Sequence, residues 1–83
     1  MKSSTTTEFR RLLAELPAEV RRAAYKQFRL WKHDPHHRSV RFKKVGSKWS
    51  ARVDRSHRAL AIELQGTMVW FYVGTHDGYQ RRI

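Results

Sequence analysis

Several side chains in the second half of this 83-residue chain are of the types that cut a phosphodiester bond. His76 follows a Gly-Thr pair at the end of an apolar stretch, and an imidazole transfers protons near neutral pH. Arg52 and Arg58 carry guanidinium groups, which bind phosphate, and the ring of Tyr79 can stack on a base. These residue types match metal-free RNA cleavage, in which a 2′-hydroxyl attacks the adjacent phosphate with the help of a base, an acid and cations.

His76 is the first candidate for the general acid or base, because a side chain at the end of a strand emerges at the rim of a sheet. The alternative is that His76 only caps the strand end or hydrogen-bonds Asp77. Tyr79 also has two interpretations: it stacks on a base or orients a phosphate, or it closes the sheet edge as a hydrophobic plug. The residues alone leave both pairs of alternatives open.

Positive charge is concentrated between residues 38 and 58, where eight Lys and Arg side chains accompany a single acid, Asp54. Arg52 and Arg58 are the candidates for phosphate binding, and Lys43 and Lys44 would form an outer electrostatic ring. The net charge of the whole chain is +11, which favours polyanionic partners such as nucleic acid or an acidic protein.

Other kinds of site have little support. His33, His36 and His37 surround Asp34, but they lack a recognised ligand spacing and the chain has no cysteine, so we expect no metal site. The chain has neither a Gly-x-Ser-x-Gly turn nor a Gly-rich phosphate loop, and we expect no cofactor.

Length and composition predict one small domain spanning residues 1–83. Without cysteine, the fold depends on aromatic and aliphatic packing, which suits a reducing cytoplasm. The N-terminal residues lack an apolar signal segment, and no later run approaches a membrane span in length, so we expect a cytoplasmic protein with no membrane partner.

Hydrophobic spacing predicts a helical hairpin over about residues 5–33. One apolar face is made by Phe9, Leu12, Leu13 and Leu16, and the next helix, beginning at Pro17, has an apolar face made by Val20, Ala24, Phe28 and Trp31. From about residue 39 to 76 the period becomes that of strands, which predicts an antiparallel sheet of about three strands followed by a short C-terminal tail. The predicted fold class is α+β, with the helices on one face of the sheet and the other face available for binding.

Arg58 is ambiguous in this pattern, because it alternates in phase with Leu60 and Ile62 while His57 alternates with two alanines. Alternation alone would direct Arg58 toward the core. A bulge near the preceding turn, or a strand covered on both faces, would resolve the conflict.

The chain resembles the RelE/ParE superfamily of bacterial type II toxins over most of residues 8–83. The resemblance rests on the order and spacing of a Leu-Pro pair between the helices, Phe42-Lys43-Lys44, Trp49-Ser50-Ala51-Arg52-Val53, His57-Arg58-Ala59-Leu60-Ala61 and Gly74-Thr75-His76-Asp77-Gly78-Tyr79. It implies a helical hairpin packed on an antiparallel sheet, and a toxin encoded beside a cognate antitoxin. Members similar to RelE, HigB and YafQ cut mRNA on the ribosome without a metal, whereas ParE-like members poison DNA gyrase.

The resemblance carries the family's strand arginine onto Arg58, its strand-end histidine onto His76 and its aromatic residue after the histidine onto Tyr79. Arg52 takes the place of the basic residue on the preceding strand, and Lys43 and Lys44 that of the cations on the first strand.

The chain departs from the family at two places. His57 stands where the family usually has tyrosine, so it either adds a proton-transfer group or only fills that place. After Tyr79 the family's C-terminal helix is missing or reduced to a turn.

These observations predict a ribosome-dependent mRNA endonuclease toxin that inhibits translation, with an antitoxin, the ribosome and mRNA as partners and no small-molecule cofactor. The alternatives are a gyrase inhibitor, which needs no imidazole, and a non-catalytic basic module that binds an acidic partner.

Overall fold

The computed structural model describes residues 2–83, which form a single mixed sheet with three helices. The elements are β1 (Lys2–Thr5), α1 (Thr7–Ala14), α2 (Ala18–His33), β2 (Lys43–Val45), β3 (Lys48–Arg52), β4 (His57–Leu64), β5 (Thr67–Thr75) and α3 (His76–Gln80). In space the strands lie in the order β1-β5-β4-β3-β2. Strands β2 to β5 form an antiparallel meander, and β1 adds to its edge in parallel with β5.

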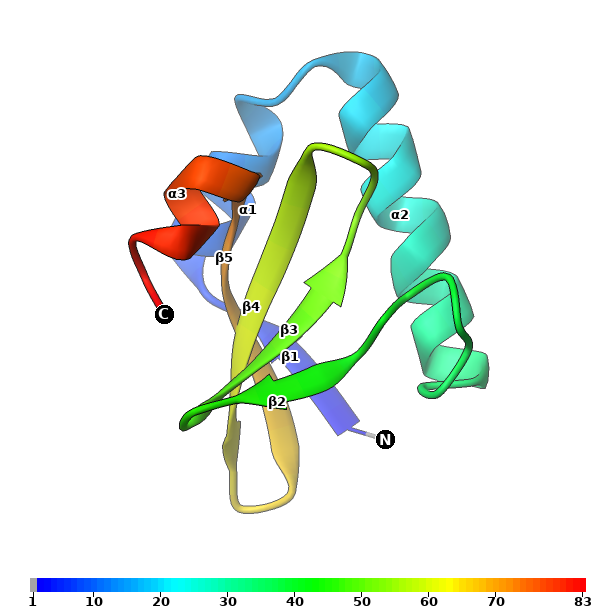
Figure 1. The fold of residues 1–83 in the computed structure, drawn as a ribbon, viewed down its shortest axis with the longest axis vertical. Helices are drawn as coiled ribbons and strands as arrows, with labels where there is room; N and C mark the ends of the chain where they lie inside the picture. Colours follow the sequence, from blue (N-terminus) through cyan, green and yellow to red (C-terminus); the bar gives the residue numbers. More distant parts are fainter. Residues whose placement is uncertain (1) are drawn as a thin grey trace.

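The sheet separates two layers of unequal size, as Figure 1 shows. Helices α1 and α2 pack their apolar residues on one face, over the main core. The short helix α3 packs against β4 and β5 on the other face, where a small second cluster contains Leu60, Tyr72 and Tyr79. The α+β class and the placement of the helical hairpin on one face are therefore confirmed.

The predicted apolar faces of both helices are the ones that pack. Phe9, Leu12 and Leu13 of α1 contact the core, and so does Leu16 just after the helix. In α2, Val20 and Trp31 are buried and Ala24 contacts the core. Phe28 remains 37% exposed, but its ring stacks on Trp31 with the centroids 5.9 Å apart.

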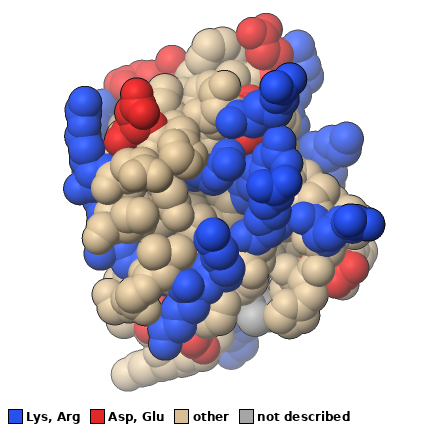
Figure 2. All heavy atoms as spheres, in the orientation of Figure 1, with Lys and Arg blue, Asp and Glu red and all other residues tan. Residues whose placement is uncertain are grey.

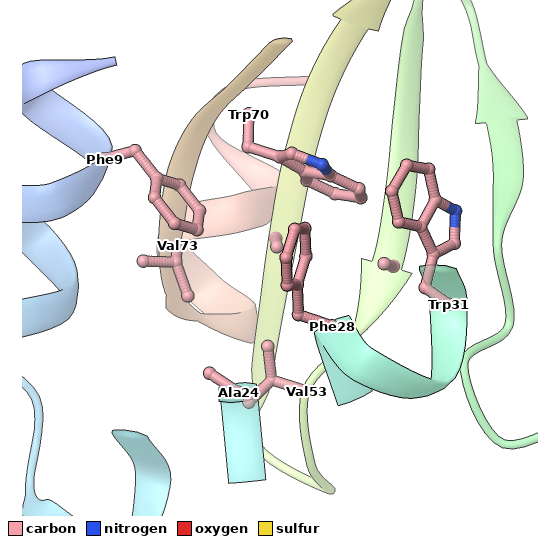
Figure 3. A pocket seen from close by; sticks show the side chains of 9 residues that line it. Phe9, Ala24, Phe28, Trp31, Val53, Trp70 and Val73 are labelled. Atoms are coloured by element: carbon pink, nitrogen blue, oxygen red, sulfur yellow. The ribbon is translucent and has the colours of Figure 1, made fainter. Parts of the chain in front are cut away.

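Aromatic rings fill much of the main core, as a small domain without disulfides requires. Trp31 is 1% exposed, and its ring contacts that of Trp70 edge to face with the centroids 5.3 Å apart. The rings of Phe42 and Trp49 stack with their centroids 4.7 Å apart. Figure 3 shows Phe28, Trp31 and Trp70 turned toward one another around a gap of about 40 Å³ between the helices and the sheet.

The sequence prediction was wrong at the N-terminus, where Lys2–Thr5 forms β1 instead of leading into the helix. Thr5 pairs with Trp70 in the sheet, and α1 begins at Thr7. The N-cap of α1 is Thr6, whose hydroxyl accepts a hydrogen bond from the backbone N–H of Phe9 at 3.0 Å. The sheet is consequently mixed, with a parallel edge that the antiparallel prediction did not include.

The ambiguity of Arg58 is resolved because β4 is covered on both faces. Ala59 and Ala61 belong to the main core under the helices, and Leu60 is fully buried in the cluster under α3. Arg58 therefore shares the α3 face. A bulge exists as well, but it lies further along the strands: Leu60 pairs with Tyr72 and Ala61 with Trp70.

The predicted C-terminal tail is partly helical, since α3 makes a little more than one turn directly after β5. Among the described residues, no helix is long and apolar enough to span a membrane.

Candidate active site

The face of the sheet that α1 and α2 leave uncovered contains a polar cleft of about 300 Å³. It lies between the β2–β3 hairpin, the start of β4 and α3, and Figure 2 shows Lys and Arg side chains spread across this face. Its chemically active lining consists of four cations, an imidazole and a phenol: Arg41, Lys43, Arg52, Arg58, His76 and Tyr79. Pairing of the strands therefore brings the predicted residues His76, Arg58, Arg52, Tyr79 and Lys43 together.

Arg52 and Arg58 are directly opposite each other on β3 and β4. Both donate to the same acceptor, the backbone carbonyl of Asp54 in the connecting turn, from Nη1 of Arg58 at 2.7 Å and from Nε of Arg52 at 3.4 Å. Each guanidinium group keeps further N–H donors beyond these bonds. The turn thus anchors two cations side by side.

The charge of Arg58 is poorly compensated. Burial lowers its pKa from the ordinary value, and the neighbouring charges of Arg52 and Arg41 lower it further. Like charges held together in a partly buried cleft are stabilised by an anion placed between them, and a phosphate matches the fork of donors on each guanidinium.

His76 is positioned by the junction of β5 and α3. Its backbone N–H donates to the carbonyl of Ser56 at 2.8 Å, which ties the junction to the β3–β4 turn. Thr75 caps α3, because its hydroxyl accepts from the N–H of Gly78 at 3.2 Å. The rings of His76 and Tyr79, one turn apart, then lie with their centroids 5.6 Å apart.

A second depression of about 460 Å³ continues on the other side of these groups. Arg58 and His76 line both hollows, and Arg55 lies in the second one. The two hollows thus meet at Arg58 and His76.

Two residues predicted for this site lie elsewhere. Lys44 pairs with Trp49, whose ring packs with the main core, so it projects from the opposite face to its neighbour Lys43. His57 alternates with Ala59 toward the helix face and is not among the described residues that line either hollow. Its Nδ1 instead lies 2.9 Å from Oδ1 of Asp54.

The bond from His57 helps to hold the turn that anchors the arginines. Partial burial opposes ionisation of Asp54, but hydrogen bonds from His57 and from the backbone N–H of Ser56 outweigh it and lower the pKa of the carboxyl. Of the two interpretations of His57, the geometry therefore favours a structural partner of the turn.

Arg41 and Arg55 are site residues that the sequence reasoning did not select. Arg41 has a left-handed backbone, with φ of 50°, just before β2 begins. Strand alternation fails at such a residue, so its direction was not predictable from its neighbours. Arg55 lies in the turn itself, where charge clustering was the one available signal.

The three histidines at residues 33–37 lie at the end of α2 and in the loop that follows it. His37 Nδ1 lies 3.0 Å from the hydroxyl of Ser39. Over residues 2–83, no group of three or more His, Asp or Glu side chains converges in a way that could hold a metal ion.

No protein-family model matches the chain, and no curated protein matches it. Solved structures do match it, and the structural superpositions cover nearly the whole chain. A YoeB/ParE toxin from Agrobacterium tumefaciens superposes with a TM-score of 0.70 at 16% identity, covering 92% of this chain and 99% of that one. The RelBE2 toxin-antitoxin complex from Mycobacterium tuberculosis gives 0.67 at 24% identity, covering 90% and 96%.

The RelB-RelE complex from Methanococcus jannaschii gives a TM-score of 0.69 at 11% identity, covering 95% of this chain and 96% of that one. This chain has the RelE/ParE toxin fold. At sequence identities this low, the structural matches establish the fold alone. The resemblance noted in the sequence is therefore confirmed for the fold. In this chain the RelE/ParE fold places Arg52, Arg58 and His76 on the sheet face that the helical hairpin leaves open.

Proposed function

We propose that this protein is the toxin of a type II toxin-antitoxin system and cuts mRNA on the ribosome without a metal. The observation that carries the proposal is the placement of His76 beside the paired guanidinium groups of Arg58 and Arg52, where two hollows meet. The RelE/ParE fold supports it, because several structures of that fold are toxins.

The proposed reaction begins when the 2′-oxygen of a nucleotide attacks the adjacent phosphorus. The O2′–P bond forms, the 2′-proton is lost, and the P–O5′ bond breaks with the 5′-oxygen taking a proton. Arg58 and Arg52 hold the phosphate and stabilise the extra negative charge of the phosphorane. His76 performs one of the two proton transfers, and Tyr79 stacks on a base or orients the phosphate.

The outer cations assist binding in this scheme. Lys43 and Arg41 line the same cleft and attract the RNA backbone electrostatically. A domain of this size has few groups that could align single-stranded RNA for in-line attack, so the ribosome supplies the positioning. The protein would therefore act in the cytoplasm, with a cognate antitoxin as its inhibitor.

The test is tightly controlled expression in a bacterial host of wild type, His76→Ala and the matched control His36→Ala. Growth is followed and the 5′ ends of cellular mRNA are mapped. His36 is an exposed imidazole in the loop after α2, outside the cleft. We expect arrest with new mRNA ends for wild type and for His36→Ala, and neither for His76→Ala at equal protein level and equal thermal stability.

Other results would redirect the proposal. Arrest with intact mRNA and damaged DNA would favour a gyrase inhibitor. Absence of arrest for wild type would favour a binding module, and a toxic His76→Ala variant would exclude His76 as the proton-transfer group.

A further inference from the structure

Helix α3 brings His76 and Tyr79 into the cleft, yet it is only five residues long. A helix this short is not stable by itself, so its position depends on what it packs against. On the sheet, the residue beneath it is Tyr72 of β5, which is 5% exposed and clusters with Leu60 and Tyr79.

The hydroxyl of Tyr72 occupies the space directly beside the backbone of α3. A Cβ atom added at Gly78 would stand closer to this oxygen than the 3.0 Å below which a neighbour must move. The same holds at Gly74 on β5, where Cζ of the ring would also lie only 2.8 Å away. Neither glycine has a positive φ among the described residues, so glycine is required at both places for space and not for conformation.

The ring of Tyr72 also holds the end of α3. The guanidinium carbon of Arg82, just after the helix, lies 4.4 Å from the ring centroid, which is a cation–π contact. Tyr72 therefore touches the region of α3 at two points, Gly78 within the helix and Arg82 beyond it. Because the ring is buried between Leu60 and Tyr79, it has little room to swing aside.

We propose that Tyr72 is a positioning residue. Its contact with Gly78 fixes the position of α3 on the sheet, which we call the seat of α3. This position in turn sets where the His76 and Tyr79 rings lie relative to Arg58. This inference rests on the proposed function and deepens it. Tyr72 acts through the helix, because the hollow that it lines lies beside Glu8, Leu12 and Arg82 and not in the catalytic cleft.

The test is to close the space at Gly78 and then to reopen it. Gly78→Ala should push α3 off its seat, although alanine favours a helix over glycine by about 1 kcal/mol. Adding Tyr72→Phe removes the obstructing oxygen, and the next ring atom, Cζ, lies at an ordinary contact distance of 3.4 Å from the new Cβ. The double variant should therefore regain the wild-type arrangement.

Two readouts are measured on the purified protein and in cells. Nuclear Overhauser contacts between the Tyr79 ring of α3 and the Leu60 side chain of β4 report the seat of α3 on the sheet. The mRNA-cleaving activity should fall about 10²-fold in Gly78→Ala, as for a displacement near 1 Å, and return in the double variant. Thermal unfolding of each variant shows whether the sheet itself is intact.

Gly74→Ala provides the matched control. Tyr72→Phe removes only the oxygen, and Cζ would still stand 2.8 Å from the Cβ at position 74, so this pair should not be rescued. Equal ring contacts in Gly78→Ala and wild type would overturn the inference, as would failure of Tyr72→Phe to restore them. If wild type itself cuts no mRNA, the proposed function fails, and the ring contacts alone decide whether Tyr72 seats α3.

Discussion

The two faces of the sheet are made by the same strands but carry different chemistry. Toward the helical hairpin, β3 and β4 present Ala51, Ala59 and Ala61, small residues on which Trp31 and Trp70 pack. Toward α3, the intervening positions present Arg52 and Arg58 in place of a continuous apolar surface. Alternation along a strand thus allows one face to supply stability while the next residue supplies charge.

The cleft face has less apolar packing to stabilise it than the helix face has. Its apolar cluster contains only three buried residues, Leu60, Tyr72 and Tyr79, and it supports a helix of five residues. Among residues 2–83, the helix face has the larger core, with ten buried residues in its cluster. We therefore expect substitutions on the helix face to change stability and those on the cleft face to change activity.

Removal of Trp31 should have the largest effect. This ring is 1% exposed and contacts Phe28, Phe42 and Trp70, so Trp31→Ala should lower the free energy of unfolding by about 3–5 kcal/mol. Urea denaturation measures the change. Tyr25→Ala on the same helix is the control, because Tyr25 is 51% exposed and its removal should cost within about 0.5 kcal/mol. Equal costs for the two variants would place the main core elsewhere.

Removal of Arg58 should separate activity from stability. Loss of a group that stabilises transition-state charge lowers a rate by about 10²–10³-fold, and we expect this for Arg58→Ala in a purified translation system. The free energy of unfolding should change by less than about 1 kcal/mol, since the lost hydrogen bonds are offset by relief from the charges of Arg52 and Arg41.

The matched control for Arg58 is Arg22→Ala, which removes the same charge from the exposed side of α2. Its cleavage rate should equal that of wild type. A similar loss of rate in both variants would mean that net charge, and not the cleft, determines activity.

Lys43 and Lys44 sharpen the comparison because they are adjacent in sequence but project from opposite faces. Binding of a single-stranded RNA oligonucleotide, followed by fluorescence anisotropy at several salt concentrations, tests the two residues. Lys43→Ala should reduce the slope of log affinity against log salt by about 0.7 for one lost phosphate contact. Lys44→Ala should leave the slope unchanged, and equal slopes would contradict binding in the cleft.

The smallest expected effect concerns the turn that anchors the arginines. The folded-state pKa of Asp54 lies below its ordinary value of 3.8, so its ionised form stabilises the fold above that value and loses this contribution as the pH falls through the folded pKa. Because the carboxylate is partly exposed, we expect only about 0.5 kcal/mol. Asp54→Asn should flatten the acid limb of the stability curve between about pH 5 and pH 2 by that amount.

His57→Gln provides the second arm of this test, since it removes the ring that contacts the Asp54 carboxylate. It should flatten the acid limb in the same direction but by less, because the N–H of Ser56 still donates to Asp54. An unchanged acid limb in both variants would mean that the ionised Asp54 carboxylate does not contribute to the stability of the fold.

Much of this architecture was predictable because it depends on local patterns. The helix faces, the strand meander and the meeting of Arg52, Arg58, His76 and Tyr79 follow from periodicity and from turns that return adjacent strands to each other. The direction of a side chain was harder to predict where neighbouring residues do not determine it. Lys44 was grouped with Lys43 by charge and by the family resemblance, although adjacent strand residues face opposite ways.

Other features were not predictable from local patterns. The segment Lys2–Thr5 has no apolar alternation, and its strand exists because the edge of β5 offers it hydrogen-bonding partners far away in sequence. Arg41 lines the cleft because its backbone is left-handed, and the residues next to it in sequence do not predict that conformation. The seat of α3 depends on the fit between Tyr72 and Gly78, which appears only when the sheet and helix are assembled.

The parallel pairing of β1 with β5 has a consequence for the order of assembly during synthesis. Lys2 is synthesised before its partner Thr67 and before all of β2, β3 and β4, so β1 must wait unpaired until these strands and β5 have been made. Closing so long a loop slows folding relative to local contacts. The cleft also depends on α3, which follows β5, so its lining is not complete until both elements have been synthesised.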